Sequence, residues 1–224
     1  MHPAAAQSLL APRPSKVAPF FALSIAGHVG FIFVGLLPWI FFSSSLVAGA
    51  SAISDRRDLL TKVRFPAQVL PATVVATNFC NYMLSLPLML ILGAFYGVLP
   101  TWHALLFVVV VFVQTLFTVA LAYLLSALNV AFRDLQQIVT NLLMLAFFMT
   151  PVIWPIENLP VKYRDLALYG NPMAAIVTSY QAIFNLHQLP ALQPLAEVAL
   201  LSILLLWFSS QLFERRREEF AELI

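Results

Sequence analysis

The residues that could do chemistry are concentrated in one short stretch of this chain. Residues 54–66 hold four of the twelve lysine and arginine residues, and no Asp, Glu, Lys or Arg occurs between Arg64 and Arg133. The chemistry that such a cluster allows is electrostatic, and positive charge beside apolar segments anchors a loop on the cytoplasmic face of a membrane. We interpret residues 54–66 as a cytoplasmic loop with an apolar span on either side.

No pattern of residues predicts catalysis, metal binding or ion coupling. There is no glycine-rich phosphate loop, no Ser/His/Asp set and no pair of carboxylates. The four histidines lack the spacing of a ligand pair, Cys80 is the single cysteine, and Glu197 falls near the start of the last span instead of mid-membrane. We therefore expect no catalytic residue, metal or cofactor on this chain, and we interpret it as a membrane subunit driven through its cytoplasmic loops.

The composition defines the fold class. The chain has 224 residues, of which 61% are hydrophobic and 10% are charged, and its mean hydropathy is +0.89. A soluble core of this size could not bury that much apolar surface. The sequence therefore predicts an integral membrane protein that is an all-α, polytopic helix bundle.

The uncharged runs and their interruptions place the spans. A bilayer is crossed by about twenty apolar residues, so the runs between charged or turn-forming segments allow about five crossings. Residues 1–16, with three prolines and two cations, are expected to be a disordered tail, and residues 17–224 are expected to form one transmembrane domain. The predicted spans are residues 19–50, 69–95, 104–128, 135–155 and 194–213.

Residues 157–190 are not predicted to cross the membrane. Asn171 followed by Pro172 is a typical helix start, with asparagine as N-cap and proline in the first turn. The apolar segment from Pro172 to about Leu186 is too short to cross a bilayer. We predict two short helices on the outer side, either re-entrant or lying in the interface.

The charge distribution predicts the orientation. The loop at 54–66, Arg133 and the C-terminal tail contribute eight Lys or Arg on one side, against Lys162 and Arg164 on the other. The first group is expected to be cytoplasmic, with the C-terminus inside. Five spans would then leave the N-terminus outside, and we expect a further segment upstream.

Five short motifs in a fixed order carry a family resemblance. They are LPWIFFS at 37–43, DLLTKVRFP at 58–66 with Leu70-Pro71 after it, SALNVAFRD at 126–134, TPVIWP at 150–155, and Asn171-Pro172. From about residue 30 to the end, the chain resembles the permease of type-2 ABC exporters of polysaccharides, as in O-antigen, capsule or teichoic acid export.

The resemblance implies partners and location. It implies a homodimer of permeases above two copies of an ABC ATPase, which carries the ATP and Mg²⁺, in the cell inner membrane. The substrate would be a lipid-linked glycan, and the contacts would include membrane lipids but no nucleic acid. The family has six spans preceded by an amphipathic cytoplasmic helix, for which this chain lacks room.

The resemblance also implies roles for particular residues. The ATPase-coupling loop would comprise Asp55, Arg56, Arg57, Asp58, Leu59, Leu60, Lys62, Val63 and Arg64. Arg133 and Asp134 would lie at the cytoplasmic mouth, and residues 157–190 would be the external gate helices. Positive-inside anchoring explains the charged residues as well. Six aromatic residues would either stack against sugar rings or anchor the chain at the membrane interface. They are Phe42, Tyr96, Trp154, Tyr163, Tyr169 and Tyr180.

Two other functions fit the same architecture. A type-2 ABC permease for a drug or another lipid would look alike in sequence. A non-transporting membrane scaffold of a glycan-synthesis complex would need no ATPase. Co-purification of a stoichiometric ATPase chain separates an exporter from a scaffold.

Overall fold

The computed structural model describes residues 25–56, 67–95, 104–132 and 134–215. Every regular element in these ranges is helical, and none is a strand. The predicted all-α membrane bundle is therefore confirmed. The elements are α3 (Ile25–Ser51), η1 (Ser54–Arg56), α5 (Val69–Phe95), α6 (Ala104–Ala131), α7 (Leu135–Met149), η2 (Ile156–Asn158), α8 (Val161–Gly170), α9 (Pro172–Phe184) and α10 (Leu192–Arg215).

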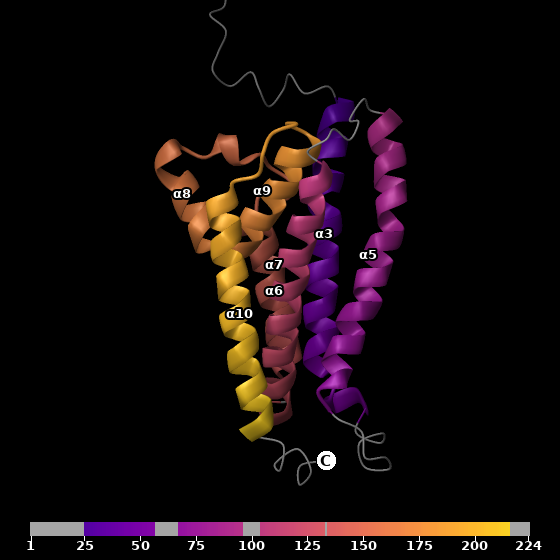
Figure 1. Ribbon diagram of the computed structural model, residues 1–224, viewed down its shortest axis with the longest axis vertical. Helices are drawn as coiled ribbons and strands as arrows, with labels where there is room; N and C mark the ends of the chain where they lie inside the picture. The colour runs from indigo at the N-terminus through magenta and orange to yellow at the C-terminus, as the bar shows by residue number, and fades with distance from the viewer. Residues whose placement is uncertain (1–24, 57–66, 96–103, 133, 216–224) are drawn as a thin grey trace, which may run out of the picture.

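Four helices are long and apolar enough to cross a membrane. Their apolar segments are Gly30–Ser51, Val69–Ile91, Leu105–Ala131 and Leu192–Phe213. Even 22 residues of helix rise about 33 Å, which exceeds the roughly 30 Å of hydrocarbon in a bilayer. The helices stand side by side along the long axis of the molecule (Figure 1). The predicted spans at 69–95, 104–128 and 194–213 correspond to α5, α6 and α10, while residues 19–24 of the first predicted span and the 1–16 tail lie outside the part described.

The helix expected over 135–155 is shorter than predicted. It ends at Met149 as α7, which has 15 residues and so a rise of only about 22 Å. Thr150 is extended, with φ −92° and ψ 137°, because the residue before a proline is sterically disfavoured in the α conformation. The Thr150 hydroxyl donates to the carbonyl of Ala146 at 2.8 Å, which closes the last turn.

Helix α6 is the centre of the bundle. It packs against α3, α5, α7, α9 and α10. Helix α3 meets it through small residues at one point, since a Cβ added to Gly49 on α3 would lie 2.9 Å from the Cβ of Ala122. Close backbone approach through glycine and alanine is how membrane helices gain packing energy without a hydrophobic driving force.

The two short helices predicted within 157–190 are present as α8 and α9, and they differ in environment. Ten of the thirteen residues of α9 are buried, and the helix contacts α3, α6 and α10. Helix α8 lies on the flank of the bundle (Figure 1), and Val161 and Leu166 on it are 74% and 69% exposed. Helix α9 is thus packed into the bundle, while α8 lies at its surface.

One end of the bundle is closed by its own small apolar cluster. Helices α3, α6 and α10 all finish at this end, where the C-terminus also lies (Figure 1). Asn129 on α6 donates to the hydroxyl of Ser54 at 3.0 Å, which ties η1 to the bundle. The cluster comprises Ala52, Ile53, Leu70, Ala127, Val130 and Phe213. It fixes the chain on both sides of residues 57–66.

Candidate functional site

A groove of about 930 Å³ runs between α3 and α7. The residues on each helix recur at intervals of three or four, so they form one face of that helix. Helix α3 and η1 supply Trp39, Ser43, Ser44, Val47, Ala48, Ser51 and Asp55, and α7 supplies Gln136, Thr140, Leu143, Met144, Phe147 and Phe148.

The groove changes character along its length. Because α3 and α7 run in opposite directions, Ser51 and Asp55 lie at the same end as Gln136 and Thr140, toward the chain's C-terminus (Figure 1). The other end is aromatic, and there the rings of Trp39 and Phe147 have centroids 5.6 Å apart. The groove thus joins a polar end to an aromatic end.

The hydroxyls of the groove are set up as acceptors. Thr140 donates its proton to the carbonyl of Gln136 at 2.9 Å, and Ser43 donates to the carbonyl of Ile40 at 3.3 Å. Their oxygens keep lone pairs for a ligand in the groove. Together with the Asp55 carboxylate and the Gln136 amide, they suit a ligand rich in hydroxyl groups.

The start of α9 is tied to the end of α7. The side-chain oxygen of Asn171 accepts from the backbone N–H groups of Met173 and Ala174 at 3.1 and 3.4 Å. Its amide nitrogen donates to the Thr150 hydroxyl at 2.9 Å. The N-cap predicted from Asn171-Pro172 is therefore confirmed, and the bond explains why the motif beginning at Thr150 accompanies it.

A second contact seats α9 against α3. The amide of Gln181 donates to the carbonyl of Pro151 at 2.8 Å, and Val152 is fully buried beside it. A Cβ added to Gly35 on α3 would lie 3.0 Å from the Val152 carbonyl oxygen and 3.2 Å from Nε2 of Gln181. The absence of a side chain at Gly35 leaves the room for this junction.

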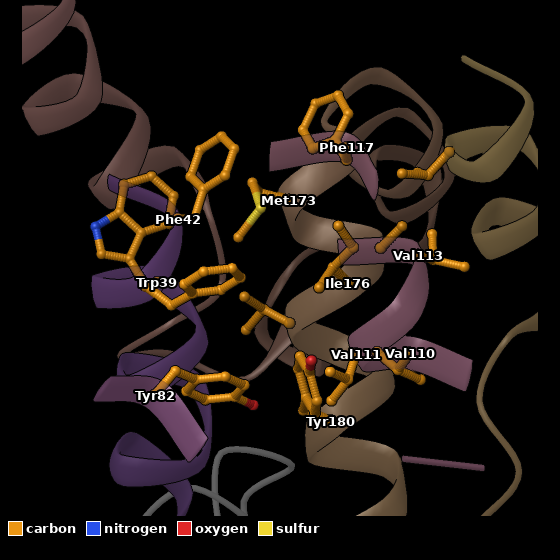
Figure 2. Close-up of a cluster of buried hydrophobic side chains, with 14 of the residues drawn as sticks. Trp39, Phe42, Tyr82, Val110, Val111, Val113, Phe117, Met173, Ile176 and Tyr180 are labelled. Carbon is orange, nitrogen blue, oxygen red and sulfur yellow. The ribbon is translucent and has the colours of Figure 1, made fainter. Parts of the chain in front are cut away.

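A short hydrogen-bond chain crosses the apolar core. The hydroxyl of Tyr180 donates to Oε1 of Gln114 at 2.6 Å, and Nε2 of Gln114 donates to the carbonyl of Pro38 at 2.8 Å. These bonds connect α9, α6 and α3. Figure 2 shows Tyr180 among apolar side chains that include Val110 and Val111. Buried polar groups in such surroundings must be paired, so the chain fixes the position of α9.

Two of the aromatic residues predicted to face a sugar lie instead in the core. Tyr180 is 1% exposed and Phe42 is 5% exposed. Phe42 stacks on Phe117, with ring centroids 5.7 Å apart and planes at 4°. Tyr180 is enclosed by apolar side chains (Figure 2). Phe42 lines an apolar hollow between α6 and α7 and does not line the groove.

The other predicted aromatic residues lie away from the groove lining. Trp154 is half-buried and donates from Nε1 to the carbonyl of Phe148 at 3.2 Å. Tyr163 and Tyr169 on α8 are 49% and 46% exposed. Tyr96 lies outside the described residues.

The predicted charged residues are only partly within the described ranges. Asp55 and Arg56 are exposed on η1, and Asp55 also lines the groove. Asp134 is exposed just before α7, without a side-chain cap bond. Arg133 and the rest of the predicted coupling loop, Arg57 to Arg64, lie outside the described residues.

The polar groove residues are a feature that the sequence analysis missed. Ser43, Ser44 and Ser51 line the groove from one face of α3, and Gln136 and Thr140, four residues apart, line it from α7. That spacing is visible in the sequence and could have marked both faces. Phe42 and Tyr180 were predicted instead because they are aromatic, and aromatic type does not indicate which face of a helix a residue occupies.

Four helices long enough to span a bilayer, a short helix buried among them and a groove between α3 and α7 are the features of a multi-pass membrane protein. A family model described as ABC-2 type transporter matches residues 13–185. The chain belongs to this family, which confirms the resemblance carried by the five motifs.

Curated relatives agree with this assignment. An O-antigen export system permease protein, RfbA, of Myxococcus xanthus is 63% identical over 195 residues, covering 87% of this chain and 75% of that protein. Two proteins of Klebsiella pneumoniae with the same name are 27% and 26% identical over 163 residues. In those two alignments the chain spans 62% of the relative.

Proposed function

We propose that this chain is the permease subunit of an ATP-driven exporter that moves a lipid-linked polysaccharide of the O-antigen type out across the cytoplasmic membrane. Support comes from its family and from the 63% identity to a protein named as an O-antigen export permease. The structural observation that carries the proposal is the groove between α3 and α7. It places serine, threonine, glutamine and aspartate side chains among apolar and aromatic ones along the side of the bundle.

The groove suits the passage of a sugar chain. Its oxygens and amide can exchange hydrogen bonds with successive hydroxyl groups, and the lining residues within the described part of the chain include no cation. The aromatic end provides flat apolar surfaces for the carbon faces of sugar rings. Weak, repeated contacts of this kind favour movement over retention.

The proposed orientation places the end with Asp55, Arg56 and Asp134 in the cytoplasm. This is the end at which α10 and the C-terminus also lie (Figure 1), and the excess of Lys and Arg in the segments around it supports that placement. Helices α8 and α9 then stand on the outer side. The same orientation puts the polar end of the groove toward the cytoplasm, where the glycan would enter.

The energy would come from a partner. We propose two copies of an ABC ATPase, binding ATP and Mg²⁺, beneath a dimer of this chain. Residues 55–64 would seat on the ATPase, and Arg133 with Asp134 would lie at the cytoplasmic mouth. The apolar cluster that holds Ile53 and Leu70 supports this role, because a loop can transmit motion only from a rigid base.

Filling the groove tests the path directly. Ala48 is exposed and lines the groove, so Ala48→Trp should obstruct it without disturbing the core. We expect export to fall about tenfold, equivalent to about 1.4 kcal/mol in the barrier. The measurement is surface glycan in cells that express the variant and the ATPase at wild-type membrane levels. Ala48→Ser, which leaves the groove open, should export normally, and full export by Ala48→Trp would remove the groove from the path.

Substitutions in residues 55–64 test whether this loop binds the ATPase. Arg57→Glu combined with Leu60→Asp should weaken ATPase association, because a truncated or reversed interface anchor costs about 2 to 5 kcal/mol. Pull-down of the ATPase with each tagged permease measures this, and Lys162→Glu on the opposite side serves as the matched charge reversal. Unchanged association and export in the double variant would leave the loop as a topology anchor only. A wild-type protein that binds no ATPase would point to the scaffold alternative. One that binds an ATPase but moves no glycan to the surface would point to the permease for a drug or another lipid.

A further inference from the structure

A second hollow lies against a neighbouring face of α7. It is a crevice of about 300 Å³ between α6 and α7, with α3 at its base and the start of α9 at one end. Phe117 and Leu125 of α6 face Leu142 and Ala146 of α7 across it, and Trp39 of α3 forms part of the base. The crevice is about twice the size of the roughly 150 Å³ apolar cavity that suffices to bind benzene.

Water is a poor occupant of this crevice. A buried water needs two to four polar partners, and Asn171 is the one lining residue with a side chain able to hydrogen-bond well, apart from the indole of Trp39. The Asn171 oxygen is already bonded to two backbone N–H groups, and its nitrogen is bonded to Thr150. The remaining lining is aliphatic and aromatic, so the crevice favours a hydrocarbon.

The surroundings identify where that hydrocarbon comes from. Leu142, at the mouth, is 58% exposed on the outside of the bundle. Trp39 lies near the middle of α3, and α6 beside it has an apolar segment of 27 residues. The mouth is thus set between α6, which is long enough to cross the bilayer, and the shorter apolar helix α7, at a depth where the medium is lipid chains.

We propose that the crevice binds one acyl chain of a bilayer phospholipid, which enters between α6 and α7 and reaches Trp39. Trp39 and Leu143 line both the crevice and the groove. A chain in the crevice therefore supports the wall of the groove from behind. The site requires only that the chain resides in a membrane, so it stands apart from the proposed export function.

Fluorescence quenching tests the proposal. A variant with Trp102, Trp154 and Trp207 each changed to Phe keeps Trp39 as the only tryptophan. It is placed in vesicles of phosphatidylcholine brominated in mid-chain, and tryptophan emission is excited selectively over that of tyrosine. Trp39 is 6% exposed, so strong quenching requires an acyl chain inside the crevice. A second variant that keeps only Trp207, which is 65% exposed, calibrates contact with bulk lipid.

Filling the crevice supplies the decisive comparison. Ala146→Phe should reduce quenching of Trp39 about twofold or more, because close-packed side chains exclude the lipid. Leu121→Phe fills the crevice from α6 and provides a second variant should Ala146→Phe fail to fold. Ala196→Phe, at an exposed position on α10, should leave quenching unchanged.

Three results would overturn the proposal. Unquenched Trp39 in the wild-type background would mean that something other than lipid, such as a second copy of the chain, covers the crevice. Quenching that persists in both filled variants would mean that bromine acts from bulk lipid. Relief of quenching by a small fraction of unlabelled polyisoprenyl phosphate, beyond that caused by plain phosphatidylcholine, would assign the crevice to the glycan carrier instead.

Discussion

Gly35→Leu is expected to lower the free energy of unfolding by about 3 kcal/mol and to abolish export, because overpacking a close junction forces backbone movement. The first added carbon would already lie 3.0 Å from the Val152 carbonyl oxygen. That neighbour is backbone within a fully buried segment, so it cannot rotate away as a side chain could. The contact of Gly35 with Val152 and Gln181 would be lost, and α9 would no longer pack closely against α3.

The control for Gly35 is another helical glycine with space around it. A Cβ at Gly170 would meet only Cδ1 of Leu166, at 3.9 Å, so Gly170→Leu should change stability little. Thermal unfolding of the purified proteins in detergent compares the two variants at equal expression. If Gly35→Leu unfolds at the wild-type temperature, the close contact between α3 and the Pro151–Val152 segment is not a structural constraint.

Gln114→Leu is expected to cost about 3 kcal/mol, since it leaves two buried polar groups with one fewer partner. Gln114 is fully buried. Its loss removes the acceptor for the Tyr180 hydroxyl and the donor to the Pro38 carbonyl. The Tyr180 hydroxyl, with 1% of the residue exposed, has no access to water that could replace the amide.

A double-mutant cycle separates the hydrogen bond from the packing. Tyr180→Phe removes the stranded hydroxyl, so the double variant should be more stable than the sum of the two single losses predicts, by about 1 kcal/mol. Gln137→Leu, at an exposed position on α7, controls for the loss of a glutamine as such. Strictly additive losses would show that the Tyr180–Gln114 contact contributes no coupling energy.

Much of the fold could be predicted from local features of the sequence. Uncharged runs of more than twenty residues can only be accommodated in a bilayer as helices, which defined α5 and α6. The span of α10 was placed by the apolar run between Glu197 and the charged C-terminal tail. The Asn171-Pro172 pair acts on its immediate neighbours, and it correctly predicted the start of α9. The exact end of α7 was missed because the residue before a proline leaves the helix earlier than the apolar run does.

The motifs indicated the family because their order along the chain is itself sequence information. Only the fold shows that two of them are in contact, since Asn171 of one motif donates a hydrogen bond to Thr150 of another. The proposed roles of residues 57–64 and Arg133 stay predictions, since they lie outside the described residues.

The sequence alone determined that the chain is a helical membrane protein, how its spans are spaced, and which family it resembles. Only the tertiary structure decided which apolar residues face protein and which face lipid. In a soluble protein, hydropathy separates the two, but here both environments are apolar, so Phe42 and Tyr180 look the same in sequence as residues on the outside. The groove was hidden for a related reason: it joins faces of α3 and α7 about ninety residues apart along the chain, and such a pairing follows from packing around α6 and not from any local pattern.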